Sequence, residues 1–214
     1  MGVEWRLLRG VPDDKVQRVL AGARRRRWAK GAVLFHEGDQ AVTLHLIAKG
    51  RLAVRMTTRR GDVLTVELLG AGDVVGELAF LTPDARRSAT VVALEASETL
   101  ALDRDVFEEL SAQDPSVSEV LLHLFAERIR RLDARLLEAL YVPADLRILR
   151  RLDELATMYG GVIPLTQEDL AGLAGTTRAT VNRVLRREVE SGTVTLSRGR
   201  ITVVDGEAVA RRAR

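Results

Sequence analysis

From Lys30 to about Leu102, short apolar runs alternate with glycines, and this pattern predicts a domain built from strands. The runs are too short for helices, and the glycines between them supply the turns of a compact sandwich, barrel or roll. Gly50, Gly61 and Gly72 each stand where a turn favours a positive φ. The runs that we expect to be strands cover residues 32–35, 44–47, 52–56, 63–69, 89–93 and 99–102.

A short helical lead-in is predicted ahead of the strands, over residues 11–28. Pro12 can begin this helix. Its apolar residues recur at helical spacing, at Val16, Val19 and Leu20. The four consecutive arginines at 24–27 are interpreted as a solvated face.

Helical patterns follow the strands. A short helix is expected over residues 104–111, and a long one from Pro115 to about Tyr141. A heptad seam along the long helix favours pairing with the same helix of a second chain. The alternative is a single amphipathic helix packed on its own strand domain. The seam residues are Leu122, Phe125, Ile129, Leu132 and Leu136.

Val142-Pro143 ends the long helix and predicts a hinge. A further helix is expected over residues 144–159, where Gly160-Gly161 ends it.

Residues 165–190 have the pattern of two helices joined by a tight turn. Thr166-Gln167-Glu168-Asp169 resembles a capping box, and the helix that it opens packs through Leu170, Leu173 and Ala174. Gly175 makes the turn, and Thr177 is a good N-cap for a second helix over residues 178–190. The buried stripe of this second helix is expected to be Val181, Val184, Leu185 and Val189.

The opposite face of the second helix is basic near its N-terminus, where a recognition helix meets base edges in the major groove. Arginine can donate two hydrogen bonds to guanine, and a helix N-terminus can bind a backbone phosphate. Stretches at 192–196 and 200–204 flank Ser197-Arg198-Gly199, which predicts a wing with a basic tip. An ordinary helical hairpin with an exposed basic face is the alternative. The candidate DNA-contacting residues are Thr166, Gln167, Thr177, Arg178, Ala179, Thr180, Asn182, Arg183 and Arg198.

Charge and cysteine content narrow the function classes. The 214 residues carry 33 Lys and Arg against 30 Asp and Glu, a formal net charge of +3, and arginine dominates the basic side. The chain has no cysteine, which excludes disulfides, cysteine-ligated zinc and cysteine-ligated iron–sulfur clusters. No apolar run approaches the roughly 18 residues of a membrane span, and the N-terminus lacks the apolar core of a signal peptide. We therefore expect a cytoplasmic protein without a membrane partner.

A glycine-rich stretch within the strand region is a second candidate site. Its glycines at 70, 72 and 76 are a near miss for a dinucleotide fingerprint, without the required spacing or strand–helix context. They fit a phosphate site better: glycine lets the backbone approach a phosphate, Arg87 supplies charge and Ser88 a hydroxyl donor. Glu77 could accept a hydrogen bond from a ribose hydroxyl. A surface loop with one arginine–glutamate pair would give the same motif.

Together these motifs resemble the CRP/FNR family of transcription regulators, the family of the cyclic-AMP receptor protein. The resemblance covers essentially the whole chain: GDVVGELAFL and RRSAT resemble the phosphate-binding cassette, the long helix runs on to LYVPADLRI, and LTQEDLAGLAGTTRATVNRVLRRE resembles the DNA-reading unit. The ending VARRAR resembles the actinobacterial branch.

The resemblance implies an α+β fold in three parts. An effector-binding β-roll of the cyclic-nucleotide-binding type would span 1–113, a dimerisation helix 114–142, and a winged helix-turn-helix 143–214. Glu77 resembles the ribose-binding glutamate, and Arg178 and Arg183 resemble the two guanine-reading arginines. The effector-binding set that the resemblance implies is Gly76, Glu77, Leu78, Ala79, Arg87, Ser88, Ala89, Leu132 and Asp133.

Two departures from the family pattern bear on specificity. Members that respond to cyclic AMP present Thr-Ser or Thr-Asn to the adenine. In this chain the corresponding residues are Leu132 and Asp133. The leucine side chain cannot form a hydrogen bond, so specificity for adenine would be reduced. Ala179 stands where the typical member has a glutamate that accepts from cytosine, so one base pair should be recognised loosely. A ligand-independent regulator, or one with another effector, therefore stays open.

We expect a homodimer, paired through residues 115–141, on double-stranded DNA, with RNA polymerase as a further partner. Cyclic AMP or a related cyclic nucleotide is a possible effector, and no cofactor or metal is obligatory. The effector would favour a dimer whose recognition helices lie about 34 Å apart, with Pro143 as the hinge. Haem would need His36, His45 or His123, which are better explained as structural. A cyclic-nucleotide-binding regulatory subunit is a remote alternative, and no nucleophile–base pair, metal cluster or Walker-type loop indicates an enzyme.

Overall fold

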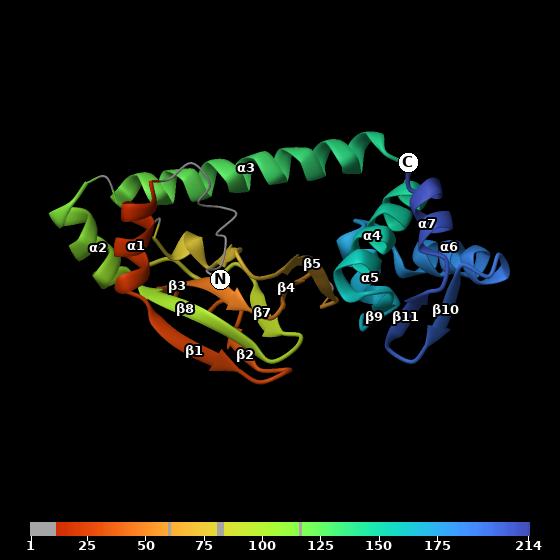
Figure 1. Ribbon diagram of the computed structural model, residues 1–214, viewed down its shortest axis with the longest axis horizontal. Coiled ribbons are helices and arrows are strands. Elements are labelled where there is room, and N and C mark those ends of the chain that lie inside the picture. The colour runs from red at the N-terminus through yellow and green to blue at the C-terminus, as the bar shows by residue number, and fades with distance from the viewer. Residues whose placement is uncertain (1–11, 60, 81–83, 116) are drawn as a thin grey trace. The chain divides into compact units, whose positions relative to one another are not determined.

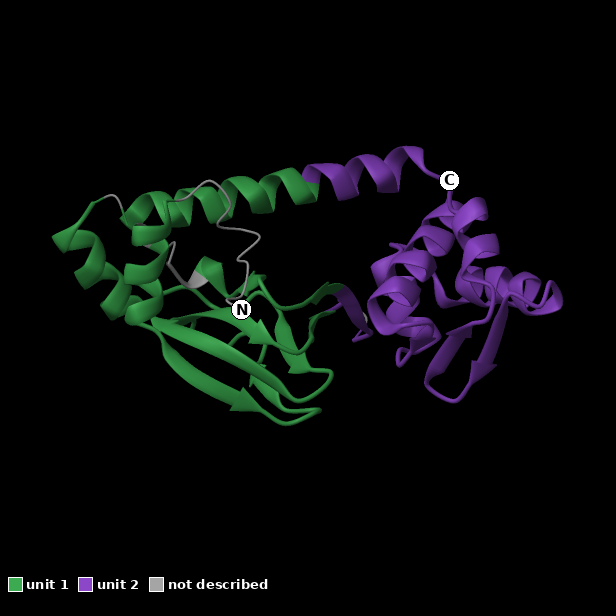
Figure 2. Cartoon of the chain, viewed as in Figure 1, with its two compact units in different colours: residues 1–56, 67–132 green, residues 57–66, 133–214 purple. Residues whose placement is uncertain are grey.

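The computed structural model describes residues 12–59, 61–80, 84–115 and 117–214. The chain divides into two compact units, drawn in different colours in Figure 2. One comprises Met1–Met56 with Glu67–Leu132, and the other comprises Thr57–Val66 with Asp133–Arg214.

Two four-stranded sheets make up a roll (Figure 1), and its strands belong to the first unit except at residues 57 and 63–66. The sheets have the orders β1-β8-β3-β6 and β2-β7-β4-β5. Along β5 and β8, buried and more exposed side chains alternate, as expected for strands with one face in the core. The strands are β1 (Arg24–Trp28), β2 (Val33–Phe35), β3 (Thr43–Lys49), β4 (Leu52–Thr57), β5 (Val63–Leu69), β6 (Val74–Val75), β7 (Thr90–Ala93) and β8 (Ser97–Asp103).

Helices cover one side of this roll. They are α1 (Asp13–Ala21), α2 (Arg104–Gln113) and the long α3 (Val117–Tyr141), with a 3₁₀ turn, η2 (Glu77–Phe80), after β6. Their apolar faces form one buried cluster with β3, β6 and β8, which removes these side chains from water and fixes the helices on the sheet. The cluster includes Val16, Val19, Leu44, Leu46, Val74, Leu102, Phe107, Val117, Val120 and Leu124.

The predicted helical lead-in over 11–28 is wrong in its second half, and residue 11 lies outside the described residues. The helix α1 ends at Ala21, and Arg24–Trp28 pairs antiparallel with β8 over five residues. Because a polar edge strand has no apolar alternation, its sequence does not signal a strand. Its charges are paired across the ladder instead, since Arg25 and Arg27 both contact Glu98.

The second unit is a helical cluster with a small sheet of order β10-β11-β9. Its elements are α4 (Ala144–Tyr159), β9 (Val162–Ile163), α5 (Gln167–Leu173), α6 (Arg178–Glu190), β10 (Val194–Ser197), β11 (Arg200–Val203) and α7 (Gly206–Arg212). Gly160 ends α4 in the left-handed conformation, with φ at 63°. The core consists of side chains less than 2% exposed, among them Ile148, Leu152, Ile163, Leu170, Val181, Leu185, Ile201 and Val209.

One member of the predicted stripe on α6 is not buried. Val181, Val184 and Leu185 are in the core, but Val189 is 42% exposed. Glu188 lies inward instead, where its carboxylate accepts hydrogen bonds from Arg212 at 2.7 and 2.8 Å and from Thr193 at 2.6 Å. The helix α7, which the sequence analysis did not foresee, supplies that arginine, so a paired carboxylate can occupy the core position.

Among the described residues, no helix has both the length and the apolar character needed to cross a membrane.

Candidate functional site

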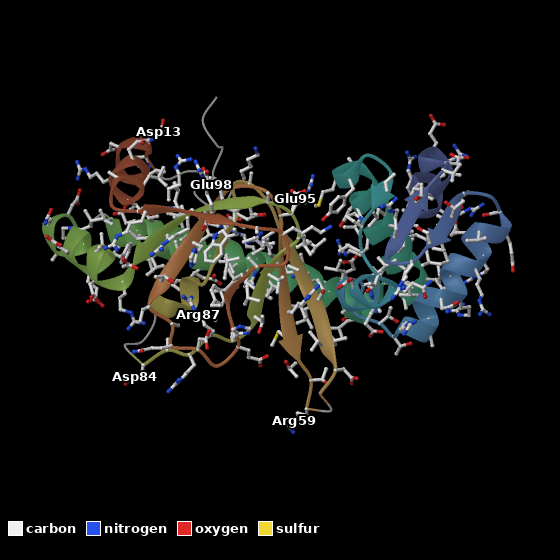
Figure 3. All side chains as sticks on the ribbon, turned by 90° about the horizontal axis from the view of Figure 1, so that it is seen from below. Asp13, Arg59, Asp84, Arg87, Glu95 and Glu98 are labelled. Atoms are coloured by element: carbon white, nitrogen blue, oxygen red, sulfur yellow. The ribbon has the colours of Figure 1, made fainter. Side chains whose placement is uncertain are left out.

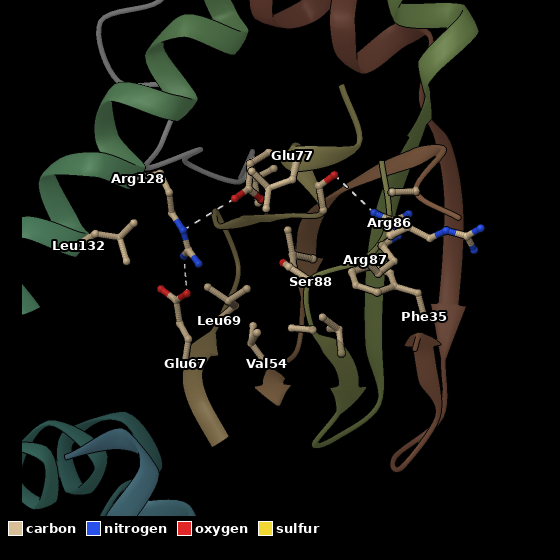
Figure 4. A pocket seen from close by; sticks show the side chains of 17 residues that line it. Phe35, Val54, Glu67, Leu69, Glu77, Arg86, Arg87, Ser88, Arg128 and Leu132 are labelled. Carbon is tan, nitrogen blue, oxygen red and sulfur yellow. Dashed lines mark hydrogen bonds and ion pairs between the residues drawn. The ribbon is translucent and has the colours of Figure 1, made fainter. Parts of the chain in front are cut away.

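A cavity of about 210 Å³ lies in the roll, with walls drawn from the strands, η2, the loop before β7 and α3 (Figure 4). Apolar side chains form much of the wall, and a few charged groups point into it. Such a cavity, apolar with a few polar groups, is typical of a small-molecule site. The wall includes Phe35, Val54, Glu67, Leu69, Gly76, Glu77, Leu78, Arg87, Ser88, Ala89, Arg128 and Leu132.

Arg87 is the most deeply placed cation of this cavity, with only 6% of the residue exposed. Figure 3 shows it within the roll, whereas Asp84, three residues earlier, lies at the edge. Its Nη2 donates to Oγ1 of Thr43 at 2.7 Å, and its guanidinium lies 3.9 Å from the ring centre of Phe35. Its Nε has no hydrogen-bond partner among the described residues. Burial lowers the pKa of Arg87 to about 10, despite the opposing charges of Asp39 and Glu77.

The backbone at Gly76 leaves room for this guanidinium. Gly76 has a φ of 84°, a conformation that side chains disfavour. Its carbonyl accepts a long hydrogen bond of 3.4 Å from Nη1 of Arg87. The glycine is therefore required both by the turn and by the close approach of the cation.

A second charged cluster lies at the α3 side of the cavity. Arg128 donates a short hydrogen bond to Glu67 and lies 3.7 Å from Oε1 of Glu77. Although burial acts against the cation, the carboxylate of Glu67 raises the pKa of Arg128. Glu67 is only 1% exposed, so this pair fixes α3 to β5 and defines the end of the cavity opposite Arg87.

The structure brings together seven of the nine residues that the sequence analysis assigned to the effector. Gly76, Glu77, Leu78, Arg87, Ser88, Ala89 and Leu132 line the cavity. Asp133 is exposed on α3 and is not among the lining residues, and Ala79 lies in η2. The sequence analysis missed Glu67 and Arg128, because their pairing depends on α3 crossing a strand 61 residues away.

In the described part of the chain, no group of three or more histidine, aspartate or glutamate side chains gathers as potential metal ligands. His45 is 5% exposed, and its ring nitrogens lie 3.1 Å from Thr99 Oγ1 and 3.3 Å from Thr43 Oγ1. Burial, followed by the charges of Arg87 and Arg26, lowers the pKa of His45 to about 4. The residue is a neutral part of the core at neutral pH.

The second unit contains the predicted two-helix element. Thr166 accepts from the backbone N–H of Asp169, whose carboxylate accepts in return from the N–H of Thr166, so the capping box is formed. Gly175 makes the turn with φ at 60°. Thr177 caps α6 by accepting from the N–H of Thr180.

The N-terminal part of α6 faces solvent. Arg178, Ala179 and Arg183 are exposed, and Asn182 and Thr180 are partly so. A groove of about 570 Å³ runs between the N-terminus of α5, this face and the β10–β11 hairpin. Its lining includes Thr166, Gln167, Arg178, Asn182 and Arg198.

Arg147 of α4, which the sequence analysis did not single out, supports this element from behind. Its Nε and Nη2 donate to the carbonyls of Ala174 and Gly175, each at 2.9 Å. Its Nη1 donates to the carbonyl of Val142 at 2.6 Å. One guanidinium therefore holds both the α5–α6 turn and the chain that follows α3, which no local sequence pattern signals.

Comparisons with known proteins match both units. The model of the cyclic nucleotide-binding domain matches residues 25–114, and that of the Crp-like helix-turn-helix domain matches residues 146–212. The chain is 34% identical to the cyclic AMP receptor protein of Thermus thermophilus, over 92% of this chain and 91% of that one. The chain belongs to the CRP/FNR family.

Other members of the CRP/FNR family are also similar. A CRP-like cAMP-activated global transcriptional regulator of Mycobacterium tuberculosis is 31% identical over 86% of each chain. The crystal structure of the Thermus thermophilus catabolite activator protein is 33% identical, covers 97% of both chains and has a TM-score of 0.55. A CRP-family regulator from the same species has a TM-score of 0.71 at 23% identity, a likeness of fold alone.

Family membership confirms the predicted fold class of a β-roll, a long helix and a C-terminal helix-turn-helix. It also confirms the predicted function class of a DNA-binding transcription regulator with a cyclic nucleotide-binding domain. The relatives are regulators, which points away from an enzyme.

Proposed function

We propose that this protein regulates transcription as a homodimer on a roughly palindromic promoter site, under the control of a cyclic nucleotide bound in the roll. The three-part division at residues 113 and 142 and the involvement of RNA polymerase belong to the same proposal. The observation that carries the effector assignment is Arg87: a buried guanidinium that lines the cavity and whose Nε has no hydrogen-bond partner within the described ranges.

A phosphate is the ligand group that best fits Arg87. The lowered pKa of Arg87 means that burial disfavours its charged form more than the nearby carboxylates favour it. An anion bound in the cavity would offset this desolvation cost. Ser88, which also lines the cavity, would add a hydroxyl donor. Charge-assisted hydrogen bonds of this kind are about twice as strong as neutral ones.

Glu77 lies between the proposed phosphate site and the Glu67–Arg128 pair, where it could accept from sugar hydroxyls. Leu132 closes the far end of the cavity without a hydrogen-bonding group. An adenine bound here would contact the apolar side chain of Leu132 and the Glu67–Arg128 pair. In members that respond to cyclic AMP, two side chains with hydroxyl or amide groups contact the adenine instead. This observation favours the second candidate, a regulator of the same fold that acts without ligand or with another effector.

The homodimer is supported by the exposed apolar side chains of α3. In a single chain Leu122, Ile129, Leu132, Leu136 and Leu140 are each 49–67% exposed on this helix. Leaving so many large apolar groups in water is unfavourable, and a second copy of the helix would bury them through the heptad seam.

Fluorescence anisotropy of a labelled palindrome, built from TGTGA half-sites and titrated with and without cyclic AMP, tests the proposal. Tighter binding with the nucleotide would support effector control. Tight binding that the nucleotide leaves unchanged would favour the second candidate. DNA binding that does not weaken with added salt would contradict the phosphate contacts that we assign to α5, α6 and the wing.

A further inference from the structure

A carboxylate from another helix lies on the base-reading face of α6. Asp145, in the first turn of α4, accepts two hydrogen bonds from Arg183: Nη2 to Oδ1 at 2.6 Å and Nη1 to Oδ2 at 3.1 Å. Arg187, one turn further along α6, donates a short hydrogen bond to the same carboxylate. One acidic group thus bridges two arginines on one face of the recognition helix.

This cluster lies at the surface. The side chains of Arg183 and Arg187 are 57% and 54% exposed, and that of Asp145 is 36% exposed. Ion pairs so open to solvent add little to folding stability. The hydrogen bond from Arg183 lowers the pKa of Asp145, so the carboxylate stays charged wherever DNA binding is measured. We therefore expect these ion pairs to affect DNA binding more than folding stability.

The bridge changes what the two arginines can bind. Arg183 uses both of its Nη groups on Asp145, so DNA must either displace the carboxylate or use the remaining N–H groups. A DNA phosphate at this place would meet the negative charge of Asp145 and be repelled. A guanine edge is neutral and offers two acceptors, O6 and N7, so it is penalised much less.

We infer that Asp145 is a specificity-determining residue of the DNA interface: its carboxylate competes with DNA phosphates for Arg183 and Arg187, so that these arginines add affinity only on a sequence that offers base-edge acceptors. The inference rests on the proposed role of α6 in DNA binding. It also gives the site an acidic group near its base-reading face, since α6 has no acidic residue in its first turn and carries Ala179 there.

The test compares Asp145→Asn with the wild-type protein on two duplexes of equal length. One is the duplex that the wild-type protein selects from a random pool, and the other is its scrambled version. Dissociation constants are measured by anisotropy at several salt concentrations. Asp153→Asn is the matched control, because it removes the same charge from α4 about two turns further along the helix.

For Asp145→Asn we expect the scrambled duplex to bind about 5- to 10-fold more tightly, with a salt slope steeper by about one to two because one or two new phosphate contacts form. Affinity for the selected duplex should change less than 3-fold, so the ratio between the duplexes falls. Asp153→Asn should leave the ratio unchanged. Asp145→Ser should repeat the result of Asp145→Asn, and a thermal melt of each variant verifies folding.

Other outcomes overturn the inference. Unchanged binding to the scrambled duplex would mean that Asp145 does not restrain the arginines. A parallel loss on both duplexes would make Asp145 a support for Arg183 and not a competitor of DNA. Salt-independent or absent DNA binding by the wild-type protein would reject the proposed interface itself, which separates the failure of the function from the failure of the inference.

Discussion

A Cβ atom at Gly76 would lie 2.4 Å from Nη1 of Arg87. The absence of a side chain at one residue is therefore what allows the guanidinium of the other to reach the cavity. This relationship joins a backbone requirement of the turn to the placement of the charge that we assign to the effector phosphate.

Gly76→Ala should separate these two roles of the glycine. Alanine at a φ of 84° costs about 1–2 kcal/mol of folding stability. It would also push Arg87 aside, so we expect cyclic nucleotide affinity, measured by calorimetry, to fall at least 10-fold. Gly31→Ala is the control, because Gly31 has a φ of 82° and no atom of the described residues lies within 4 Å of its Cβ position. Equal loss of affinity in both variants would mean that backbone strain alone is responsible.

Arg87→Met should abolish effector binding without harming the fold. Truncating a buried charge that contacts an anion costs about 2–5 kcal/mol, a loss of roughly 30-fold or more in nucleotide affinity. Without ligand, the thermal midpoint should stay level or rise, because a poorly compensated buried cation has been removed. Arg27→Met, at an 84% exposed side chain on β1, should change neither quantity. Retained affinity in Arg87→Met would place the phosphate elsewhere.

His45 predicts how the stability of the roll depends on pH. Its pKa is about 4 in the folded protein against 6.5 when unfolded, so the unfolded chain takes up a proton first as pH falls. The neutral ring contributes fully above pH 6.5, and that contribution is lost between pH 6.5 and 4. At pH 5 the loss is about 2 kcal/mol relative to the stability well above pH 6.5.

Urea unfolding at pH 7 and pH 5, followed by tryptophan fluorescence, measures this dependence. His45→Gln should remove most of the difference between the two pH values, whereas His36→Gln, at an exposed position, should retain it. If wild type and His45→Gln lose stability equally, other groups govern the acid sensitivity.

The exposed seam of α3 predicts the oligomeric state. Ile129→Glu places a charge on the seam where pairing would bury it, so we expect the sedimentation coefficient to change from that of a dimer to that of a monomer. Ala134→Glu adds the same charge to an exposed residue off the seam and should leave the dimer intact. A dimer that survives Ile129→Glu would place the interface elsewhere.

Features whose determinants are local in sequence could be predicted. The capping box at Thr166, the turn at Gly175 and the cap at Thr177 lie within twelve residues, and each has the predicted geometry. The apolar run at 63–69, which lies between Gly61 and Gly70, likewise predicts its strand. Local patterns suffice here because the groups that satisfy one another are near neighbours along the chain.

Features that depend on distant partners could not be predicted. Arg24–Trp28 forms a strand because its backbone pairs with β8. Glu188 can lie in the core because Arg212 of α7 donates a hydrogen bond to its carboxylate. The Glu67–Arg128 and Asp145–Arg183 pairs join residues 61 and 38 positions apart. In each case the sequence alone suggests that a charged residue is exposed to solvent. Its oppositely charged partner comes close only when the helices and strands pack together.

Arg147 is the last such residue, and its replacement should weaken the DNA-binding element from a distance. Arg147→Met leaves four backbone carbonyls without their charged donor: those of Ala139, Val142, Ala174 and Gly175. We expect the thermal stability of the second unit to fall by about 2–4 kcal/mol, because hydrogen bonds to charged groups contribute about 1.5–3 kcal/mol each and do not add fully.

Affinity for the scrambled and the selected duplex should fall together in Arg147→Met, since the turn before α6 loses its support while every DNA-facing side chain remains. This parallel loss distinguishes Arg147 from Asp145, for which only the ratio should change. Arg186→Met removes an exposed arginine of α6 and should leave the melting temperature unchanged. If Arg147→Met retains both stability and affinity, the turn is held by the capping groups of α5 and α6 alone.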